Sequence, residues 1–373
     1  MSGSKPDEIL NTLQRAGYEA YYVGGCVRDH LLGRPIHDCD IATSALPEQT
    51  MACFDHCVPT GIRHGTVTVL LEQYQAEVTT FRSDGTYGDS RHPDRVEFVR
   101  TLQEDLARRD FTINAMAMTQ DHVVTDLYGG REDLERRCLR CVGDPDQRFQ
   151  EDALRMLRAV RFSAQLDFEI EENTRQAMER RAGLCETLSM ERIRDEMEKT
   201  LLSDHPERLQ DMARLGLLNC CSPDKEQECH WLGKLPPVRE IRWAGLCRLW
   251  PELDLVRLRL DKRTAQNAMK AGRSAFPETR LDWKRRIVRE GRDCVLLSAA
   301  LCGKYDEIRE MLRSGECISL RELAVNGADF PELHGPQVGE ILHMLLDHVL
   351  AYPQDNVREK LFQIYKNSID YCF

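Results

Sequence analysis

The sequence lacks any apolar run that approaches the roughly 18 residues needed to cross a bilayer. Of its 373 residues, 42% are hydrophobic and 30% are charged, which is the balance of an ordinary soluble chain and excludes a membrane protein. The opening residues, MSGSKPDEILNTLQ, also lack the charged start, apolar stretch and cleavage site of a secretory signal. We therefore expect a cytoplasmic protein with several domains, at very roughly 150 residues for each domain.

Paired cysteine motifs are also missing. The 15 cysteines are odd in number and scattered through segments with helical patterns, unlike the short framework of a disulfide-rich secreted protein. Cys138 and Cys141 are spaced as in a zinc site, yet no second pair follows at a suitable spacing, and Cys53 and Cys57 are no better placed. We expect reduced thiols and no structural zinc.

Positive charge is scarce, because 62 Asp and Glu outnumber 51 Lys and Arg, for a net charge of −11. Indiscriminate nucleic-acid binding needs a surplus of Lys and Arg to contact phosphates, and this charge argues against it. The segment 236–292 is an exception, with fifteen Lys and Arg against seven Asp and Glu, so it carries +8 and the rest of the chain −19. A local basic surface suits a specific RNA partner, although a solvated helical face has the same composition.

Strand patterns are confined to the first part of the chain. Four strands are expected, at 18–23, 36–42, 65–71 and 75–81, with a glycine turn and a short helix between the first two. After Asp144 these patterns almost vanish, and apolar residues recur at helical spacing over 151–165, 191–202 and 206–215. The fold class we expect is α+β, with a small mixed-sheet head followed by an all-helical remainder.

Asp38 and Asp40 lie two residues apart in a predicted strand, so their side chains point the same way and can share a hard, oxygen-seeking cation. Cys39 and Ile41 would then face the core. Glu77, on another predicted strand, could join the pair as a third carboxylate that orients or deprotonates an attacking hydroxyl. Acidic pairs are also common on solvated surfaces, so this hypothesis depends on the neighbouring motifs.

Groups suited to phosphate flank the acidic pair. The Gly24-Gly25 turn offers free backbone N–H groups, and Arg28 on the following helix offers a guanidinium to a polyphosphate. The later run RRDFTIN supplies Arg109 as a second guanidinium and Asp110 as a helix N-cap. The turn lacks the third spaced glycine of a dinucleotide-binding fold, so a nucleotide with a metal is the better match.

The predicted helix from residue 151 carries one polar stripe, in which Asp152, Arg155, Arg158 and Arg161 recur every three residues. Such a stripe is usually the solvated face of a helix, and alone it would indicate nothing more. It is nevertheless suited to base recognition, since a carboxylate accepts a hydrogen bond from an amino group and a guanidinium donates to ring acceptors.

Taken in order, these segments resemble the motifs of the class II nucleotidyltransferase family, and of its bacterial CCA-adding members in particular. The matching motifs are GGCVRD at 24–29, DCD at 38–40, RRDFTINAM at 108–116 and EDALR at 151–155. The resemblance covers roughly residues 20 to 170, with a looser match from 191–193 to 215–218. Beyond about residue 220 the chain is only generically helical.

The resemblance implies roles for these residues. The implied metal ligands are Asp38 and Asp40, which would hold Mg²⁺, with Glu77 as a further catalytic residue. The implied nucleotide contacts are Gly25, Arg28, Arg109, Asp152, Arg155, Arg158 and Arg161. Among these, Asp152 and Arg155 would read the incoming base. The implied reaction is template-independent addition of C, C and A to the 3′ end of tRNA, from CTP and ATP, by two-metal phosphoryl transfer.

The implied architecture has four parts: a catalytic head at 1–140, a helical neck with the base-recognition helix at 141–220, a helical body at 221–272 and a tRNA-binding helical tail at 273–373. Proline and glycine break the helical pattern at 223–237 and 272–277, near two of these boundaries. The polar segment 82–95, with two glycines and a proline, is expected to be a mobile loop needed chiefly for the final A.

Three alternatives stay open. Poly(A) polymerases of the same class share these motifs, but they commonly carry strongly basic extensions that this sequence lacks. Enzymes that add only CC or only A are a second alternative, and the segment 82–95 argues against the CC-only kind. An RNA-binding protein with a dead catalytic centre is a third, against which the intact Asp38, Asp40 and Arg109 count. The sequence leaves the oligomeric state open, a homodimer included, and shows no His-Asp phosphohydrolase signature.

Overall fold

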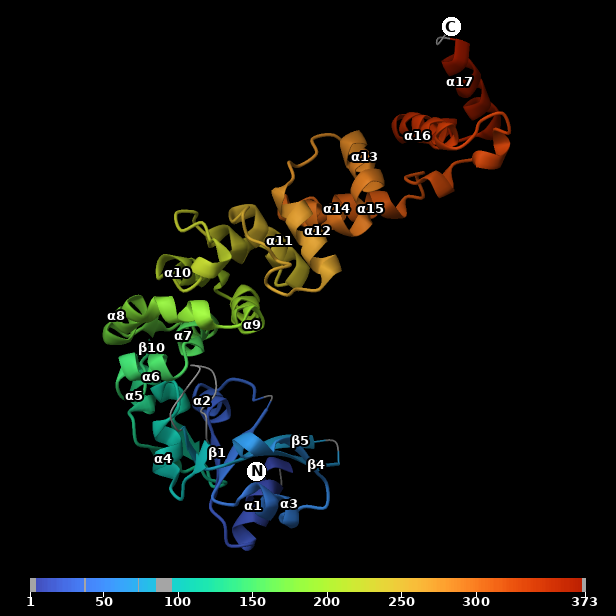
Figure 1. Cartoon of the computed structure of the whole chain (residues 1–373). Helices are drawn as coiled ribbons and strands as arrows, with labels where there is room; N and C mark the ends of the chain where they lie inside the picture. Colours follow the sequence, from blue (N-terminus) through green and yellow to red (C-terminus); the bar gives the residue numbers. More distant parts are fainter. Residues whose placement is uncertain (1–4, 37, 73, 85–95, 371–373) are drawn as a thin grey trace. The chain divides into compact units, whose positions relative to one another are not determined.

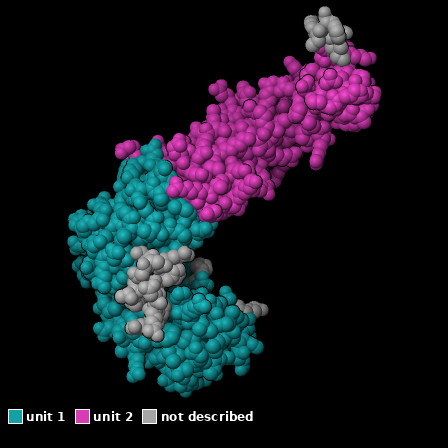
Figure 2. All heavy atoms as spheres, viewed as in Figure 1, with its two compact units in different colours: residues 1–225 teal, residues 226–373 magenta. Residues whose placement is uncertain are grey.

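The computed structural model describes residues 5–36, 38–72, 74–84 and 96–370. The chain divides into two compact units, residues 1–225 and 226–373, which have different colours in Figure 2. The division lies within 223–237, where proline was expected to break the helical pattern. The finer division into head, neck, body and tail stays a prediction.

A seven-stranded mixed sheet lies in the first unit, with the strand order β3-β4-β5-β2-β1-β8-β9 (Figure 1). Its strands are β1 (Ala20–Val23), β2 (Asp40–Thr43), β3 (Cys57–Gly61), β4 (Thr66–Leu71), β5 (Tyr74–Thr80), β8 (Met116–Met118) and β9 (Val124–Asp126). Within this sheet, as far as the structure describes it, only β2 and β5 pair in parallel. The four predicted strands are confirmed, but the second begins at Asp40, not at residue 36, because its partner β1 ends at Val23, opposite Asp40.

Short helices pack against this sheet. They are α1 (Lys5–Arg15), α2 (Gly25–Leu31), α3 (Pro47–Cys53), α4 (Leu102–Ala107) and α5 (Gly130–Glu135). The apolar face of α1 places Ile9, Leu10 and Leu13 out of reach of solvent, and each buried side chain of this size contributes roughly 1.5–3 kcal/mol. A second two-stranded sheet joins β6 (Arg82–Asp84) to β7 (Val96–Phe98).

The remainder of the first unit is mainly helical. Its helices are α6 (Pro145–Glu151), α7 (Leu154–Leu166), α8 (Glu172–Arg181), α9 (Met190–Leu201) and α10 (Leu209–Arg214), and one short parallel pair joins β10 (Cys138–Leu139) to β11 (Glu169–Ile170). The prediction of one helix from residue 151 to 165 is wrong. Asp152 has an extended backbone, with φ of −144°, and its carboxylate accepts from the backbone N–H of Leu154 at 3.0 Å, so it ends one helix and begins the next.

The second unit contains only helices and loops in the residues that the structure describes. Its helices are α11 (Arg239–Leu249), α12 (Lys262–Arg273), α13 (Arg280–Glu290), α14 (Arg292–Leu301), α15 (Tyr305–Arg313), α16 (Pro336–Ala351) and α17 (Arg358–Asp370). Trp283, Val295, Phe330 and Leu345 lie in its core. The α+β class with a mixed-sheet start and a helical remainder is confirmed. Across the described ranges, no helix is both long and apolar enough to cross a membrane.

Candidate active site and nucleotide pocket

A cleft of about 1380 Å³ in the first unit collects residues from every motif singled out in the sequence. Its lining includes Gly24, Gly25, Arg28, Asp38, Asp40, Glu77, Arg109, Asp152, Arg155, Arg158 and Arg161. These residues come from β2, β5 and the segment before β2, from α2 and the glycine before it, from the loop after α4 and from the region of α7. The fold therefore brings every candidate site residue to the wall of one cleft.

Three carboxylates meet on one side of the sheet. Asp40 and Glu77 are partner residues on the parallel strands β2 and β5, so their side chains project from the same face. Although Asp40 is exposed at the cleft, desolvation by the surrounding protein raises its pKa, the charge of Arg109 opposes that rise, and Glu77 and Asp38 add to it. A bound cation would relieve this repulsion between like charges.

Asp38 and Asp40 suit a magnesium site that the substrate completes. Over the described ranges, no three or more His, Cys, Asp and Glu side chains are arranged to hold a metal ion by themselves. Mg²⁺ is usually bound by one or two carboxylates together with substrate phosphates and water, so a pair at the edge of an open cleft fits its chemistry.

Gly24 allows the glycine turn to approach Arg109. Its φ is 73°, a left-handed conformation, and a Cβ built on it would lie only 2.9 Å from Nη1 of Arg109 and 3.9 Å from Oδ2 of Asp40. Glycine is therefore required here both by the backbone conformation and by the available space. The turn, Asp40 of β2 and this guanidinium form one compact arrangement.

Arg109 is fixed from behind by Asp105 on α4. Its Nη2 donates to Oδ2 of Asp105 at 3.1 Å, while Arg108 donates to Oδ1 at 2.8 Å. Burial of Asp105 opposes its negative charge, but the two guanidiniums outweigh this effect and lower the pKa of the carboxyl group. The ionised Asp105 holds Arg109 in position at the cleft.

A chain of polar contacts links α2 to α7. Arg28 donates to Oδ1 of Asn114 at 2.9 Å, Asn114 donates to Oδ1 of Asp110 at 3.2 Å, and Nε of Arg158 donates to Oδ2 of Asp110 at 2.8 Å. Burial disfavours the charge of Asp110, but Arg158 more than compensates and holds the pKa of that carboxyl well below its usual range. The prediction that Asp110 caps a helix is wrong, because only a single 3-10 turn follows, at Thr112–Asn114.

Phe162 on α7 is surrounded by guanidiniums. The Cζ atoms of Arg161, Arg158 and Arg28 lie 4.0, 5.2 and 5.3 Å from the centre of its ring, within the range of cation–π attraction. Arg161 is also held by an ion pair with the buried Glu196 of α9. The ring therefore gathers three guanidiniums at one wall of the cleft, although each is also paired with a carboxylate, Arg28 with Asp29, Arg158 with Asp110 and Arg161 with Glu196.

The two predicted base-reading residues are held by different parts of the unit. Asp152 accepts from Nη2 of Arg192 on α9, whereas Arg155 is buried and donates to Oε2 of Glu151 at 2.7 Å and to the carbonyl oxygen of Arg108 at 2.9 Å. Asp152 thus lies outside α7 and does not share one helical stripe with Arg155. Both side chains still line the same cleft.

Family models match much of this unit. Residues 20–140 match the model described as Poly A polymerase head domain, and residues 167–227 match that of a probable RNA and SrmB-binding site of polymerase A. A CCA-adding enzyme of Geobacillus thermodenitrificans is 40% identical over 381 residues, covering 95% of this chain and 94% of that protein. The chain belongs to the CCA-adding enzyme family.

Other members of the family give the same result. A CCA-adding enzyme of Limosilactobacillus reuteri is 46% identical over 268 residues, a match that spans 72% of this chain and 66% of that protein. The crystal structure of the Bacillus stearothermophilus CCA-adding enzyme in complex with CTP is 35% identical and superimposes with a TM-score of 0.84, over 98% of both chains. The membership therefore rests on sequence and fold along nearly the whole chain.

Some site residues of this family member were not singled out from the sequence. Arg192 and Lys199 on α9 line the cleft, and Asp105 holds Arg109 from behind. The looser motif match at 191–193 was the only sequence signal for Arg192. The predicted mobile loop at 82–95 lies outside the described residues from 85 onward, and its first residues form β6.

Proposed function

We propose that this protein adds C, C and A to the 3′ end of tRNA, using CTP and ATP and no nucleic-acid template. The observation that carries the proposal is the cleft itself. It is lined both by the carboxylates of Asp38, Asp40 and Glu77 and by the guanidiniums around Phe162. Membership of the CCA-adding family supports it, as does the similar B. stearothermophilus enzyme, whose structure contains CTP.

Asp38 and Asp40 would hold two divalent ions, which we propose to be Mg²⁺. When bound, such ions lower the pKa of the RNA 3′-hydroxyl and neutralise the triphosphate and the departing pyrophosphate. The chain's own groups bind and orient the reactants. We assign Arg28, Arg109 and the N–H groups at Gly25 to the phosphates, and Glu77 to the attacking hydroxyl, which it would orient or deprotonate.

Selection of the base is assigned to Asp152 and Arg155, with Arg158 and Arg161 completing the pocket. A carboxylate only accepts hydrogen bonds and a guanidinium only donates them. Cytosine and adenine each present an amino group beside a ring acceptor, so both match this pair. Uracil and guanine present the opposite pattern and would leave buried groups unpaired.

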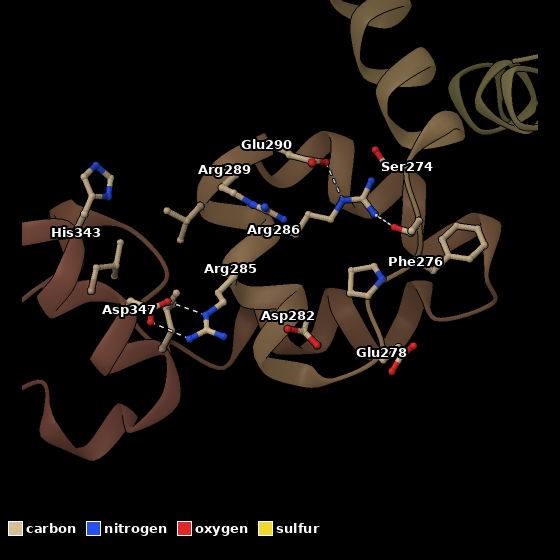
Figure 3. Close-up of a pocket in the computed structure, with 15 residues that line it drawn as sticks. Ser274, Phe276, Glu278, Asp282, Arg285, Arg286, Arg289, Glu290, His343 and Asp347 are labelled. Carbon is tan, nitrogen blue, oxygen red and sulfur yellow. Dashed lines mark hydrogen bonds and ion pairs between the residues drawn. The ribbon is translucent and has the colours of Figure 1, made fainter. Parts of the chain in front are cut away.

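The basic segment 236–292 is a weaker RNA surface than its charge suggests. Several of its cations are neutralised by acids within the second unit, through the pairs Arg263–Asp293, Arg280–Glu316, Arg285–Asp347, Arg286–Glu290 and Arg292–Glu322. Figure 3 shows two of these pairs, at Arg285 and Arg286, beside the pocket between α13 and α16. We propose the exposed Lys262, Lys270 and Arg289 as the better candidates for contact with tRNA phosphates.

One time course tests the proposed activity. Transcripts of tRNA that lack the 3′-terminal CCA would be incubated with CTP alone, ATP alone and both, and the products resolved at single-nucleotide length. We expect two additions with CTP alone and three with both nucleotides. A long A tail with ATP alone would instead assign a poly(A) polymerase, the activity named by the matching head model, and a stop at CC or a requirement for a CC end would assign a partial enzyme.

A further inference from the structure

Two thiols meet beside the carboxylate pair. Cys26 lies in the first turn of α2, directly after the Gly24-Gly25 turn, and Cys39 lies between Asp38 and Asp40. Cys26 is buried, with its Sγ 3.2 Å from the carbonyl oxygen of Val23 and 3.9 Å from that of Asp40. The side chains of Cys26 and Cys39 are close enough to each other to interact. Two segments of the catalytic centre are thus in contact through sulfur.

One of these thiols is accessible and the other is not. Cys39 is half-buried and contributes to the lining of the cleft, so a small solute that enters the cleft can reach it. Cys26 is 5% exposed and lies behind it. This arrangement of an outer thiol with a second thiol within contact distance is the geometry that lets a singly oxidised cysteine be trapped as a disulfide.

We propose that Cys26 and Cys39 form a reversible oxidation site, at which a peroxide converts the dithiol to a disulfide and thereby inactivates nucleotide transfer. In the first step the Cys39 sulfur attacks one peroxide oxygen, giving a sulfenic acid and, from hydrogen peroxide, one water. In the second step the Cys26 sulfur attacks the Cys39 sulfur and a second water leaves. The two thiols lose two electrons and two protons, and the peroxide is reduced to two waters.

The bond would disturb catalysis because of where its two ends lie. A disulfide requires the sulfurs to approach to about 2.05 Å, far closer than two sulfurs that are not bonded to each other. Closing that gap pulls on the residue directly before β2, between Asp38 and Asp40, and on α2 directly after Gly25. Catalytic groups need to be held to within about 0.5 Å of their productive geometry, so a shift of either segment lowers the rate of transfer. This effect on activity depends on the proposed function, whereas formation of the bond does not.

The test uses the full-length protein, first reduced and then treated with hydrogen peroxide. Mass spectrometry of a non-reducing digest would identify the linked peptides, and CTP incorporation into tRNA lacking its CCA end would be measured before oxidation, after it, and after dithiothreitol. The variants are Cys39→Ser and Cys26→Ala, each compared with its own reduced activity. The matched control is the double variant Cys220→Ser and Cys221→Ser, which removes another close thiol pair, with sulfurs 3.6 Å apart, that does not line the cleft.

We expect a Cys26–Cys39 linked peptide in the wild type and the control, with a loss of activity of about tenfold or more that dithiothreitol restores. Cys39→Ser and Cys26→Ala should both lack the linked peptide. After peroxide, Cys39→Ser should keep most of the activity that it has when reduced. Absence of the linked peptide from the oxidised wild type would overturn the proposed oxidation site. This outcome needs only the wild type, so it holds even if a variant fails to fold. A linked peptide without loss of activity would overturn the inactivation, and no transfer by the reduced wild type would count against the proposed function instead.

Discussion

Nη2 of Arg192 donates to both carboxylate oxygens of Asp152, at distances of 3.1 and 2.9 Å. Arg192 belongs to α9 and Asp152 to the break between α6 and α7, so this contact joins two helices that lie far apart in the sequence. A carboxylate has about four lone-pair positions, and since the backbone N–H of Leu154 also donates to Oδ1, one of them remains available for an amino group. Arg192 therefore orients Asp152 without preventing it from accepting a hydrogen bond from a base.

The first prediction concerns base selection. Asp152→Ala should lower the use of CTP and ATP but narrow the preference for CTP over UTP. In the wild type, the carbonyl oxygen of uracil would face the carboxylate of Asp152, and the variant removes this unfavourable contact. Each mismatch is worth roughly 1–3 kcal/mol, or about 5- to 150-fold in selectivity. The measurement is kcat/KM for all four nucleotides. Arg158→Ala, checked for folding, should slow all four more evenly, and an active Asp152→Ala enzyme with unchanged CTP preference would refute the assignment.

The second prediction concerns the carboxylates on β2 and β5. Asp38→Ala or Asp40→Ala should abolish transfer while tRNA affinity stays nearly unchanged, since these groups are assigned to metals and not to the RNA body. Rate would be followed by CTP incorporation and affinity by filter binding. Either variant that retained more than about a tenth of the rate, a deficit of only about 1.4 kcal/mol, would contradict the metal assignment. Glu77→Gln removes the negative charge from the residue paired with Asp40. If Glu77 deprotonates the attacking hydroxyl, this variant should change the pH profile of the rate.

The third prediction separates backbone strain from steric contact at the glycine turn. Gly24→Ala places a methyl group 2.9 Å from Nη1 of Arg109, so it should displace that guanidinium and raise KM for both CTP and ATP. Gly33→Ala is the matched control, because Gly33 also has a positive φ, of 66°, but nothing lies within 4 Å of its added Cβ. Both changes carry a strain of roughly 1 kcal/mol or more. Equal kinetic effects of the two would show that strain, not contact with Arg109, is responsible.

The sequence motifs predicted which residues meet in the cleft better than how they are held. Asp38 and Asp40 both line the cleft, but strand alternation is not the reason, because β2 begins only at Asp40 and Cys39, which alternation would turn to the core, lines the cleft as well. Glu77 joins Asp40 because the two are partner residues on parallel strands. The periodicity of three that joined Asp152 to α7 was misleading. An aspartate can bond to the backbone two residues on, and this local competition ends a helix without altering the pattern around it.

Long-range charge pairing was beyond the reach of sequence patterns. Arg192 and Asp152 meet through the packing of α7 on α9, and Arg285 and Asp347 through that of α13 on α16. A count of charges along the chain cannot record such pairs. For that reason the segment 236–292 looked more basic in sequence than its surface is.

The last prediction concerns the buried pair of Asp110 and Arg158. The folded protein holds the pKa of Asp110 below its ordinary value of 3.8, so between the two pKa values the unfolded chain binds more protons than the folded one. The stabilising contribution is therefore fully present above the ordinary pKa and is lost as the pH falls toward the folded pKa. Asp110→Asn leaves Arg158 uncompensated and should cost about 3 kcal/mol at pH 7. As the pH falls from 5 to 3, the difference in stability between wild type and variant should narrow by about 1 kcal/mol, because each pKa unit corresponds to about 1.4 kcal/mol.

The measurement must report on the first unit. Tryptophan fluorescence cannot do so, since Trp231, Trp243, Trp250 and Trp283 all belong to the second unit. Hydrogen exchange at the amides of α7, which carries Arg158, gives a local free energy of opening at each pH. Asp146→Asn serves as the control. The hydrogen bonds from Arg180 and Arg181 also lower the pKa of Asp146, but these arginines are largely exposed and solvent screens the pairs, so its effect should be smaller. The difference in the free energy of opening of α7 between wild type and Asp110→Asn should shrink from pH 5 to pH 3. If it stayed constant or widened, the ionised carboxylate would not be what stabilises α7.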